Sequence, residues 1–280
     1  MADKTIYIPV LLLFISFLMG CGITGTAIKG ESKKIWHPQQ DDVFINSIGM
    51  EFKLIRAGSF LMGSPADEKD RNSDEGIHLV EIKDPFYLGI YEVTQAQWRA
   101  VMGNNPSCFK GDDRPVEQVP WNDVSVFIRK LNAREATDKY RLPKEAEWEY
   151  ACRSGTNSPF SFGNCLSTKE ANYNGNYPYQ GCLKGEYLGK TLPVGSLRAN
   201  AFGLYDMHGN VGEWCQDRYD KYYYFSSPSH DSRGPATGAC RVIRGCGWYL
   251  PAYLCRSAHR GIYGQDYCCD AIGFRLLRMP

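Results

Sequence analysis

The stretch Gly203-Leu-Tyr-Asp-Met-His-Gly-Asn-Val-Gly-Glu-Trp214 decides the fold of this chain, and further blocks stand on either side of it. Arg141-Leu-Pro-Lys-Glu-Ala-Glu-Trp-Glu-Tyr150 precedes it. Arg241-Val-Ile-Arg-Gly-Cys-Gly-Trp248 and Gly273-Phe-Arg-Leu276 follow it. Gly, Asn, Pro and Tyr recur so often over residues 154–238 that long helices and strands are not expected there. The chain therefore reads as a domain of short regular elements joined by extensive loops.

Short strands are expected before the first block. Residues 44–63 alternate partly between apolar and polar side chains and end in a turn at Gly63-Ser-Pro65, which is typical of an opening hairpin. Val80–Ile82 and Phe86–Leu88 are two further short strands on either side of an Asp-Pro pair.

Three helices are expected. Thr94, followed three residues later by Gln97, predicts a capping box for a helix that runs through Met102. A second helix begins at Asn122 as its N-cap, and its apolar residues share one helical face: Val124, Phe127, Ile128 and Leu131. A third covers residues 145–150, where the helix dipole accounts for the three glutamates near the N-terminus.

The first 21 residues are typical of a bacterial lipoprotein signal peptide. The apolar run is too short for a good membrane span and leads to Leu18-Met-Gly-Cys21, where the thiol of Cys21 is the expected lipidation site. An uncleaved signal anchor is the alternative. Residues 22–43 are expected to form a flexible tether and residues 44–280 one domain. We therefore expect a protein outside the cytoplasm, attached by its lipid to the outer membrane or cell surface.

Composition narrows the possible functions. The net charge is +1, with acidic and basic residues interleaved, so no basic surface suited to nucleic acid is expected. There are 18 Tyr, 13 Phe and 6 Trp, enough for one aromatic-rich core. No phosphate-binding loop and no Gly-x-Ser-x-Gly nucleophile elbow is present.

The 11 cysteines indicate an oxidising compartment. Besides Cys21, an even number remains, which favours disulfides as the role of most of them. Cys165 and Cys182 bracket a loop that they could close, and the adjacent Cys268 and Cys269 most easily pair with two different partners. The sequence leaves the connectivity open.

The blocks quoted above, together with Gly58-Ser-Phe-Leu-Met-Gly-Ser64, Gly89-Ile-Tyr-Glu-Val-Thr-Gln95 and Pro120-Trp-Asn122, resemble the formylglycine-generating enzyme (sulfatase-modifying factor) family over residues 44–277. The resemblance implies a compact, irregular α+β fold, distantly similar to C-type lectins, with few long elements. It also implies two calcium ions.

The resemblance places these calcium ions in two loops, where carboxylate and carbonyl oxygens suit Ca²⁺. The first ion is expected near Asn210, the Val211 carbonyl and Glu213. The second is expected near Asn172, the Tyr173 carbonyl, Glu186 and the Leu188 carbonyl. The alternative is that the Asn side chains cap turns and the Glu side chains are solvated.

Active members of the family bind Cu⁺ through two cysteines that follow an Arg-Gly-Gly-Ser-aromatic block, and they oxidise a substrate cysteine to formylglycine. Soft thiolates suit Cu⁺. Here the block is Arg244-Gly-Cys-Gly-Trp248, so Gly247 replaces the serine and Leu250 replaces the first cysteine. An ungapped alignment keeps Cys255 as the second cysteine, whereas a gapped one assigns it to the later Arg-Ser-Ala-x-Arg element and retains neither.

Two hypotheses follow. In the first, the domain is a non-catalytic binding or scaffold module for an exported protein or peptide, or for a glycan, with the membrane reached only through the lipid anchor. In the second, it is a copper-dependent oxidase in which Cys255 is the retained thiolate, Cys246 its surrogate partner and Trp214 a wall of the site. A Cys246–Cys255 disulfide is the structural alternative to such a pair. The related iron-dependent enzymes are disfavoured, because none of the five histidines are four residues apart.

Overall fold

The computed structural model describes residues 42–226 and 234–280. The predicted signal peptide, the predicted lipidation site Cys21 and nearly all of the predicted tether lie outside the described residues. All of the described residues belong to one compact unit. Within the described ranges, no helix has the length and apolar character needed to cross a membrane.

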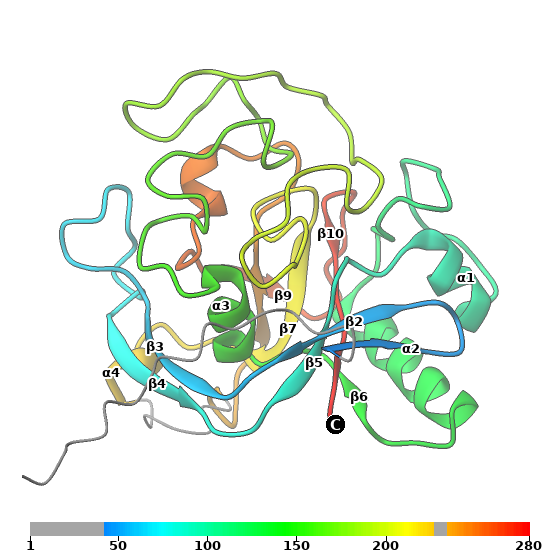
Figure 1. Cartoon of the computed structure of the whole chain (residues 1–280). Helices are drawn as coiled ribbons and strands as arrows, with labels where there is room; N and C mark the ends of the chain where they lie inside the picture. The colour runs from blue at the N-terminus through cyan, green and yellow to red at the C-terminus, as the bar shows by residue number, and fades with distance from the viewer. Residues whose placement is uncertain (1–41, 227–233) are drawn as a thin grey trace, which may run out of the picture. The chain divides into compact units, whose positions relative to one another are not determined.

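A five-stranded antiparallel sheet collects segments from most of the domain (Figure 1). In spatial order its strands are β1 (Val43–Ile45), β2 (Glu51–Ile55), β5 (Phe86–Gly89), β11 (Leu277–Arg278) and β6 (Tyr140–Arg141). The expected opening hairpin is present as β1 and β2, with Phe44 opposite Phe52. The expected strand at Val80–Ile82 belongs to β4 (His78–Ile82), which pairs with β3 (Gly58–Met62) in a separate two-stranded sheet. The second half of the 44–63 region therefore pairs with β4 and not within the hairpin.

A four-stranded sheet contains the ends of two sequence blocks, the one at residues 203–214 and the one at residues 241–248. Its order is β10 (Ile272–Gly273), β7 (Gly212–Arg218), β8 (Cys240–Arg244) and β9 (Gly261–Gly264). β10 is parallel to β7, and the other pairs are antiparallel. β9 forms an edge of this sheet. From Ser154 to Val211 the chain has no strand or helix, as expected from its turn-forming composition. The seven-residue strand β7 also falls in the 154–238 region, where no long strand was expected, and corrects that part of the prediction.

The helices follow the sequence prediction with one correction. α1 (Gln95–Met102) has the expected capping box, in which the Gln97 N–H donates to the Thr94 hydroxyl. α2 (Trp121–Arg134) begins two residues earlier than predicted, because its N-cap is Pro120 and not Asn122. Pro120 has no side-chain cap to offer, but its carbonyl accepts from the Asp123 N–H at 3.0 Å as well as from the Val124 N–H at 3.1 Å, which satisfies one donor of the first turn. α3 (Glu145–Arg153) extends past residue 150, and two short helices follow: α4 (Tyr223–Ser226) and η2 (Ala252–Cys255).

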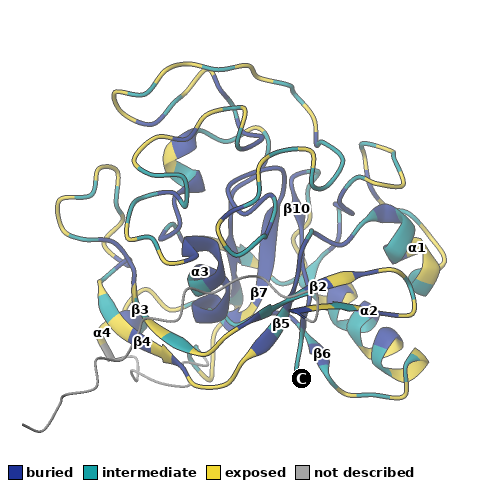
Figure 2. Cartoon of the chain, viewed as in Figure 1, coloured by how far each residue is buried: buried dark blue, intermediate teal, exposed yellow. Residues whose placement is uncertain are grey.

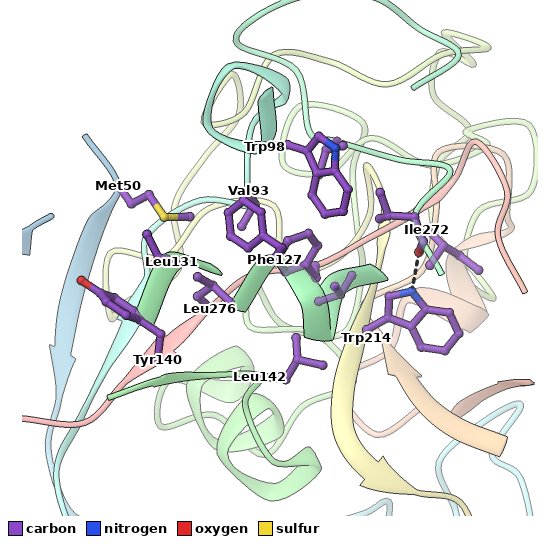
Figure 3. Packing of buried hydrophobic residues seen from close by; sticks show 14 of the residues in the cluster. Met50, Val93, Trp98, Phe127, Leu131, Tyr140, Leu142, Trp214, Ile272 and Leu276 are labelled. Atoms are coloured by element: carbon purple, nitrogen blue, oxygen red, sulfur yellow. Dashed lines mark hydrogen bonds between the residues drawn. The ribbon is translucent and has the colours of Figure 1, made fainter. Parts of the chain in front are cut away.

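The main core lies between the five-stranded sheet and helices α1 and α2 (Figures 2 and 3). Trp98 from α1 stacks on Phe127 from α2, with ring centroids 5.3 Å apart, and Phe274 meets both rings edge-on. Burying large aromatic side chains contributes roughly 2–3 kcal/mol each. The predicted apolar face of α2 is confirmed, since Val124, Phe127 and Leu131 are fully buried and Ile128 packs against the same cluster.

The three glutamates of α3 are buried and paired with arginines, so the helix dipole alone does not account for them. Glu145 accepts two hydrogen bonds from Arg260, Glu147 two from Arg141, and Glu149 bonds to Arg153 and Arg244. Burying a carboxylate is costly unless a cation and further hydrogen bonds compensate. These pairs join α3 to β8 and to the segment after η2.

Candidate functional site

A disulfide between Cys246 and Cys255 stands at the end of β8. Its Cα atoms are 4.8 Å apart, and it closes the loop that leads into η2. The two cysteines that the oxidase hypothesis assigned as copper ligands are therefore bonded to each other in this structure. Closing a loop of this length stabilises the fold by about 2–3 kcal/mol.

Cys246 occupies a backbone conformation that favours glycine. Its φ is +75°, directly after Gly245 at +93°. The left-handed region costs an L residue with a Cβ about 1–2 kcal/mol. The family block that this segment resembles has glycine at the position of Cys246. The disulfide therefore stabilises the loop at a position where the cysteine itself carries backbone strain.

Cys246 lines a cavity of about 360 Å³ on the four-stranded sheet. Glycines from three segments line it: Gly212, Gly247 and Gly261. Apolar side chains supply most of the remaining wall: Ile243, Leu250, Leu254, Ile262, Ala271 and Ile272. Gly247 also fits its surroundings closely, because a Cβ there would lie 2.7 Å from the Ala271 Cβ. The serine of the family block would therefore collide with Ala271 unless the backbone shifted.

The ionisable side chains that line the cavity carry no free charge. Burial lowers the pKa of His259 to about 4, so its imidazole is neutral at pH 7. Among the described residues nothing hydrogen-bonds that imidazole. The guanidinium of Arg260 donates to both oxygens of Glu145, at 2.8 and 3.0 Å, and to the Asp74 and Asp220 carbonyls. The remaining polar side chains are the hydroxyls of Tyr249 and Tyr263.

Trp214 does not line this cavity. Its side chain is fully buried in the main core, and its indole N–H donates to the Val119 carbonyl at 2.9 Å (Figure 3). Its neighbour on β7, Glu213, is equally buried. The expectation of Trp214 as a wall of the site is therefore not met by this arrangement, because alternation along β7 turns its side chain into the core.

The side chains of the first predicted calcium site are bonded to protein groups. Glu213 accepts from the Arg275 Nε and Nη2 atoms, at 2.7 Å each, and from the Trp148 indole. The Asn210 Oδ1 accepts from the Leu192 N–H at 2.7 Å. The Glu213 carboxylate and the Asn210 amide oxygen therefore already accept hydrogen bonds from protein groups. These two side chains do not fit a calcium ion. Val211 contributes its N–H to Glu92 at 3.1 Å.

The second predicted calcium site fits better. The structure brings its two segments side by side, because the Gly185 N–H donates to the Gly175 carbonyl and the Asn172 Nδ2 donates to the Lys190 carbonyl. The Asn172 Oδ1 is buried and has no partner among the described residues. Asn172 and Tyr173 are buried, Glu186 is exposed, and Leu188 is partly exposed. The unpaired buried oxygen of Asn172 suits a hard cation, and the neighbouring segment carries the exposed Glu186. Among the described residues, no three His, Cys, Asp or Glu side chains gather in a metal-binding geometry.

The remaining cysteines divide into one further disulfide and several thiols. Cys165 and Cys182 form the loop-closing disulfide that their spacing suggested, with Cα atoms 5.7 Å apart. Cys268 and Cys269 are free, so the expectation that each pairs with a different cysteine is wrong in this structure. Cys152 is buried, and burial raises the pKa of its thiol to about 12, which keeps it protonated. Two disulfides are typical of a protein outside the cytoplasm.

Sequence reasoning missed His259 and the cavity around it. His259 was visible only as one residue of the Arg256-Ser-Ala-His-Arg260 element. The pair Gly261 and Gly264 on β9 was the other signal, since glycine inside a strand often marks close approach of a ligand or another backbone.

The fold is that of a sulfatase-modifying-factor type of domain. Residues 47–280 match the model of the sulfatase-modifying factor enzyme 1-like domain, and the chain belongs to this family of formylglycine-generating enzymes and their relatives.

Relatives with different names share this domain. The chain is 30% identical over 273 residues to the chaperone protein LppX of Paenibacillus barcinonensis, covering 83% of this chain and 90% of the relative. It is 36% identical over 191 residues to the formylglycine-generating enzyme of Streptomyces coelicolor, covering 65% of this chain but only 58% of the enzyme. The structure of PvdO from Pseudomonas aeruginosa superimposes with a TM-score of 0.74 at 32% identity, covering 87% of this chain and all of PvdO.

Proposed function

We propose that this chain is a non-oxidising domain of its family that binds segments of exported polypeptides outside the cytoplasm. The Cys246–Cys255 disulfide is the observation that supports the absence of oxidase chemistry most directly. Copper binding by thiolates requires two deprotonated sulfurs. Here Leu250 stands where the resemblance expects the first cysteine, and the two sulfurs nearby are bonded to each other.

A polypeptide partner is favoured over a glycan by the character of the cavity. A sugar carries several hydroxyls that need hydrogen-bonding partners once buried. The cavity offers few polar side chains, and the Arg260 guanidinium among them is already bonded to Glu145. One relative that covers most of this chain carries the name chaperone, which agrees with a polypeptide ligand.

The oxidase alternative is tested with a peptide of the pattern Cys-x-Pro-x-Arg. The full chain is first reduced, loaded with Cu⁺ and supplied with oxygen, and the peptide is analysed by mass spectrometry for the aldehyde. We expect no aldehyde above the level given by the Cys255→Ser variant. Turnover that disappears in Cys255→Ser would overturn the proposal of a non-oxidising domain.

Polypeptide binding is tested with a permanently unfolded protein, reduced and carboxymethylated α-lactalbumin. Co-sedimentation with the full chain is expected for this probe and not for native α-lactalbumin. If a polysaccharide binds and the unfolded protein does not, the ligand is a glycan and the proposal of polypeptide binding is wrong.

Attachment through a lipid on Cys21 is part of the same proposal. The motif Leu18-Met-Gly-Cys21 supports it. We expect the mature N-terminal peptide to carry a diacylglyceryl group by mass spectrometry. A Cys21→Ala variant, released without lipid, is the matched control, whereas an unmodified wild-type Cys21 would contradict the anchor.

We further propose one calcium ion at the second predicted site. Asn172 would supply its Oδ1, and Tyr173 and Leu188 their carbonyls, with Glu186 as the carboxylate. When bound, the ion would fix the loop 185–190 against residues 172–175. Its proposed role is structural, because it would hold residues 186–188 against Asn172 and Tyr173, which belong to the loop closed by the Cys165–Cys182 disulfide.

A further inference from the structure

Strand β9 has an unpaired outer edge. It is the last strand of the four-stranded sheet, and among the described residues no other strand pairs with its outer side. Its inner side pairs with β8, Ile243 lying opposite Gly261 and Val242 opposite Ile262. Every second residue of an edge strand directs its N–H and C=O outward. The Gly264 carbonyl already accepts from the Tyr267 N–H at 2.9 Å, so the outward main-chain groups of residues 261–263 are the ones available to a further strand.

The sequence of β9 suits close approach by another backbone. The strand reads Gly-Ile-Tyr-Gly, and at Gly264 an added Cβ would meet no atom within 4 Å. Gly264 also lacks the positive φ that favours glycine. Neither crowding nor backbone conformation within the domain therefore requires glycine there. Glycine in a strand often marks a place where another main chain comes close.

The cavity opens beside the same strand. Gly261, Ile262 and Tyr263 all contribute to its lining, so a chain that lies along β9 also lies along the cavity. The volume of about 360 Å³ is large enough for one large side chain. Its lining is aliphatic and aromatic, and neither His259 nor Arg260 presents a free charge to it. Such a cavity favours an uncharged apolar group.

We propose that the outer edge of β9 and the adjoining cavity form one binding site for an extended polypeptide strand. The strand pairs its main chain with β9 and inserts one aromatic or large aliphatic side chain into the cavity. Main-chain pairing supplies sequence-independent affinity, and the pocket supplies specificity, as in other complexes formed by strand addition. This inference rests on the proposed polypeptide binding and names its mode.

The test uses a fluorescein-labelled seven-residue peptide, Gly-Ser-Thr-Phe-Thr-Ser-Gly, and measures anisotropy on titration with the full chain. Two versions carry N-methyl groups, one on the even and one on the odd peptide bonds. Only one of the two sets can face β9. We expect one version to bind at least 10-fold more weakly than the parent peptide and the other within about 2-fold of it. Replacing the central Phe by Asp is expected to weaken binding at least 10-fold.

A pair of neighbouring substitutions tests the cavity. Leu254 lines it, whereas the adjacent Tyr253 is exposed and does not. Leu254→Trp is expected to fill the cavity and to weaken binding of the Phe peptide at least 10-fold, and Tyr253→Trp to leave it unchanged. If Leu254→Trp fails to fold, the N-methylated peptides still decide the proposal.

The outcomes separate this inference from the proposed function. If carboxymethylated α-lactalbumin binds but both N-methylated peptides bind as tightly as the parent, strand addition at β9 is wrong and polypeptide binding stands. If neither the unfolded protein nor any peptide binds, the proposed function fails and this inference fails with it. Binding of a polysaccharide at β9 that Leu254→Trp abolishes would also overturn the inference.

Discussion

Arg275 holds the carboxylate of Glu213 with two hydrogen bonds of 2.7 Å, and both side chains are fully buried. Arg275 also donates to the carbonyls of Gly89, Ile90 and Tyr205, so this guanidinium joins β5, β7 and the loop before β7. The glutamate of the Gly-Asn-x-x-Glu-Trp pattern at residues 209–214 therefore forms a buried ion pair inside this domain.

Replacing Glu213 by Gln is therefore expected to destabilise the domain by about 3–5 kcal/mol, because it leaves the Arg275 charge buried without its partner. Urea unfolding measures the change. Asp112→Asn, which breaks the exposed Arg99–Asp112 pair, is the control and should cost less than about 1 kcal/mol. A loss in Glu213→Gln that appears only when calcium is present would instead make Glu213 a calcium ligand.

Calcium is expected to raise the unfolding temperature of the wild-type chain relative to the same protein in EDTA, since a ligand of the folded state stabilises it. Asn172→Ala should abolish the difference, because it removes the unpaired buried Oδ1. Differential scanning calorimetry measures both. Asn176→Ala, at an exposed position in the following loop, serves as the control. A calcium response that survives in Asn172→Ala would refute the assignment of the ion to Asn172.

Asp217 is expected to make the domain less stable as the pH rises. Burial, together with the negative charge of Glu145, raises the pKa of Asp217 to about 7 from its ordinary 3.8. The folded state therefore keeps a proton that the unfolded state has lost, and stability falls between about pH 4 and pH 7.

The Asp217→Asn variant lacks the ionisable carboxyl group and should lose this pH-dependent part of its stability. The drop in its unfolding free energy from pH 5 to pH 7 should therefore be about 2 kcal/mol smaller than in the wild type. Urea unfolding at the two pH values measures the difference. Equal pH dependence in the two proteins would show that Asp217 is ionised in the folded state.

Cys246→Gly is expected to be less damaging than Cys246→Ala. Both lose the disulfide, but glycine relieves the backbone strain at φ +75° whereas alanine retains it. The difference should be about 1 kcal/mol in favour of glycine, measured by urea unfolding with Cys255 changed to Ser in both proteins. Equal stabilities would mean that the loop leaves the left-handed conformation once the disulfide is absent.

Local signals in the sequence predicted the local structure well. The Thr94–Gln97 capping box and the apolar face of α2 each depend on residues a few positions apart, and the structure has both. The Cys165–Cys182 disulfide was suggested in the same way. The family resemblance supplied the α+β class and the shortage of long elements.

Contacts between distant segments could not be predicted in that way. Glu145 and Arg260 lie 115 positions apart, and the acidic start of α3 gives no indication of which arginine approaches it. The cavity is equally non-local, since its walls come from β7, β8, β9, β10, η2 and the segments on either side of η2. Whether His259 meets a partner or an open space depends on how these segments pack. The packing of these segments depends on residues throughout the chain and cannot be predicted from any single motif.

The two residues of β11 occupy an interior position in the five-stranded sheet, between β5 and β6. Leu277 is opposite Leu88 on one side and Arg141 on the other. Until residues 277–278 arrive, β5 and β6 cannot be bridged, and the sheet is divided into two parts. During synthesis, the five-stranded sheet therefore closes only after β11 has followed β5 and β6 out of the ribosome.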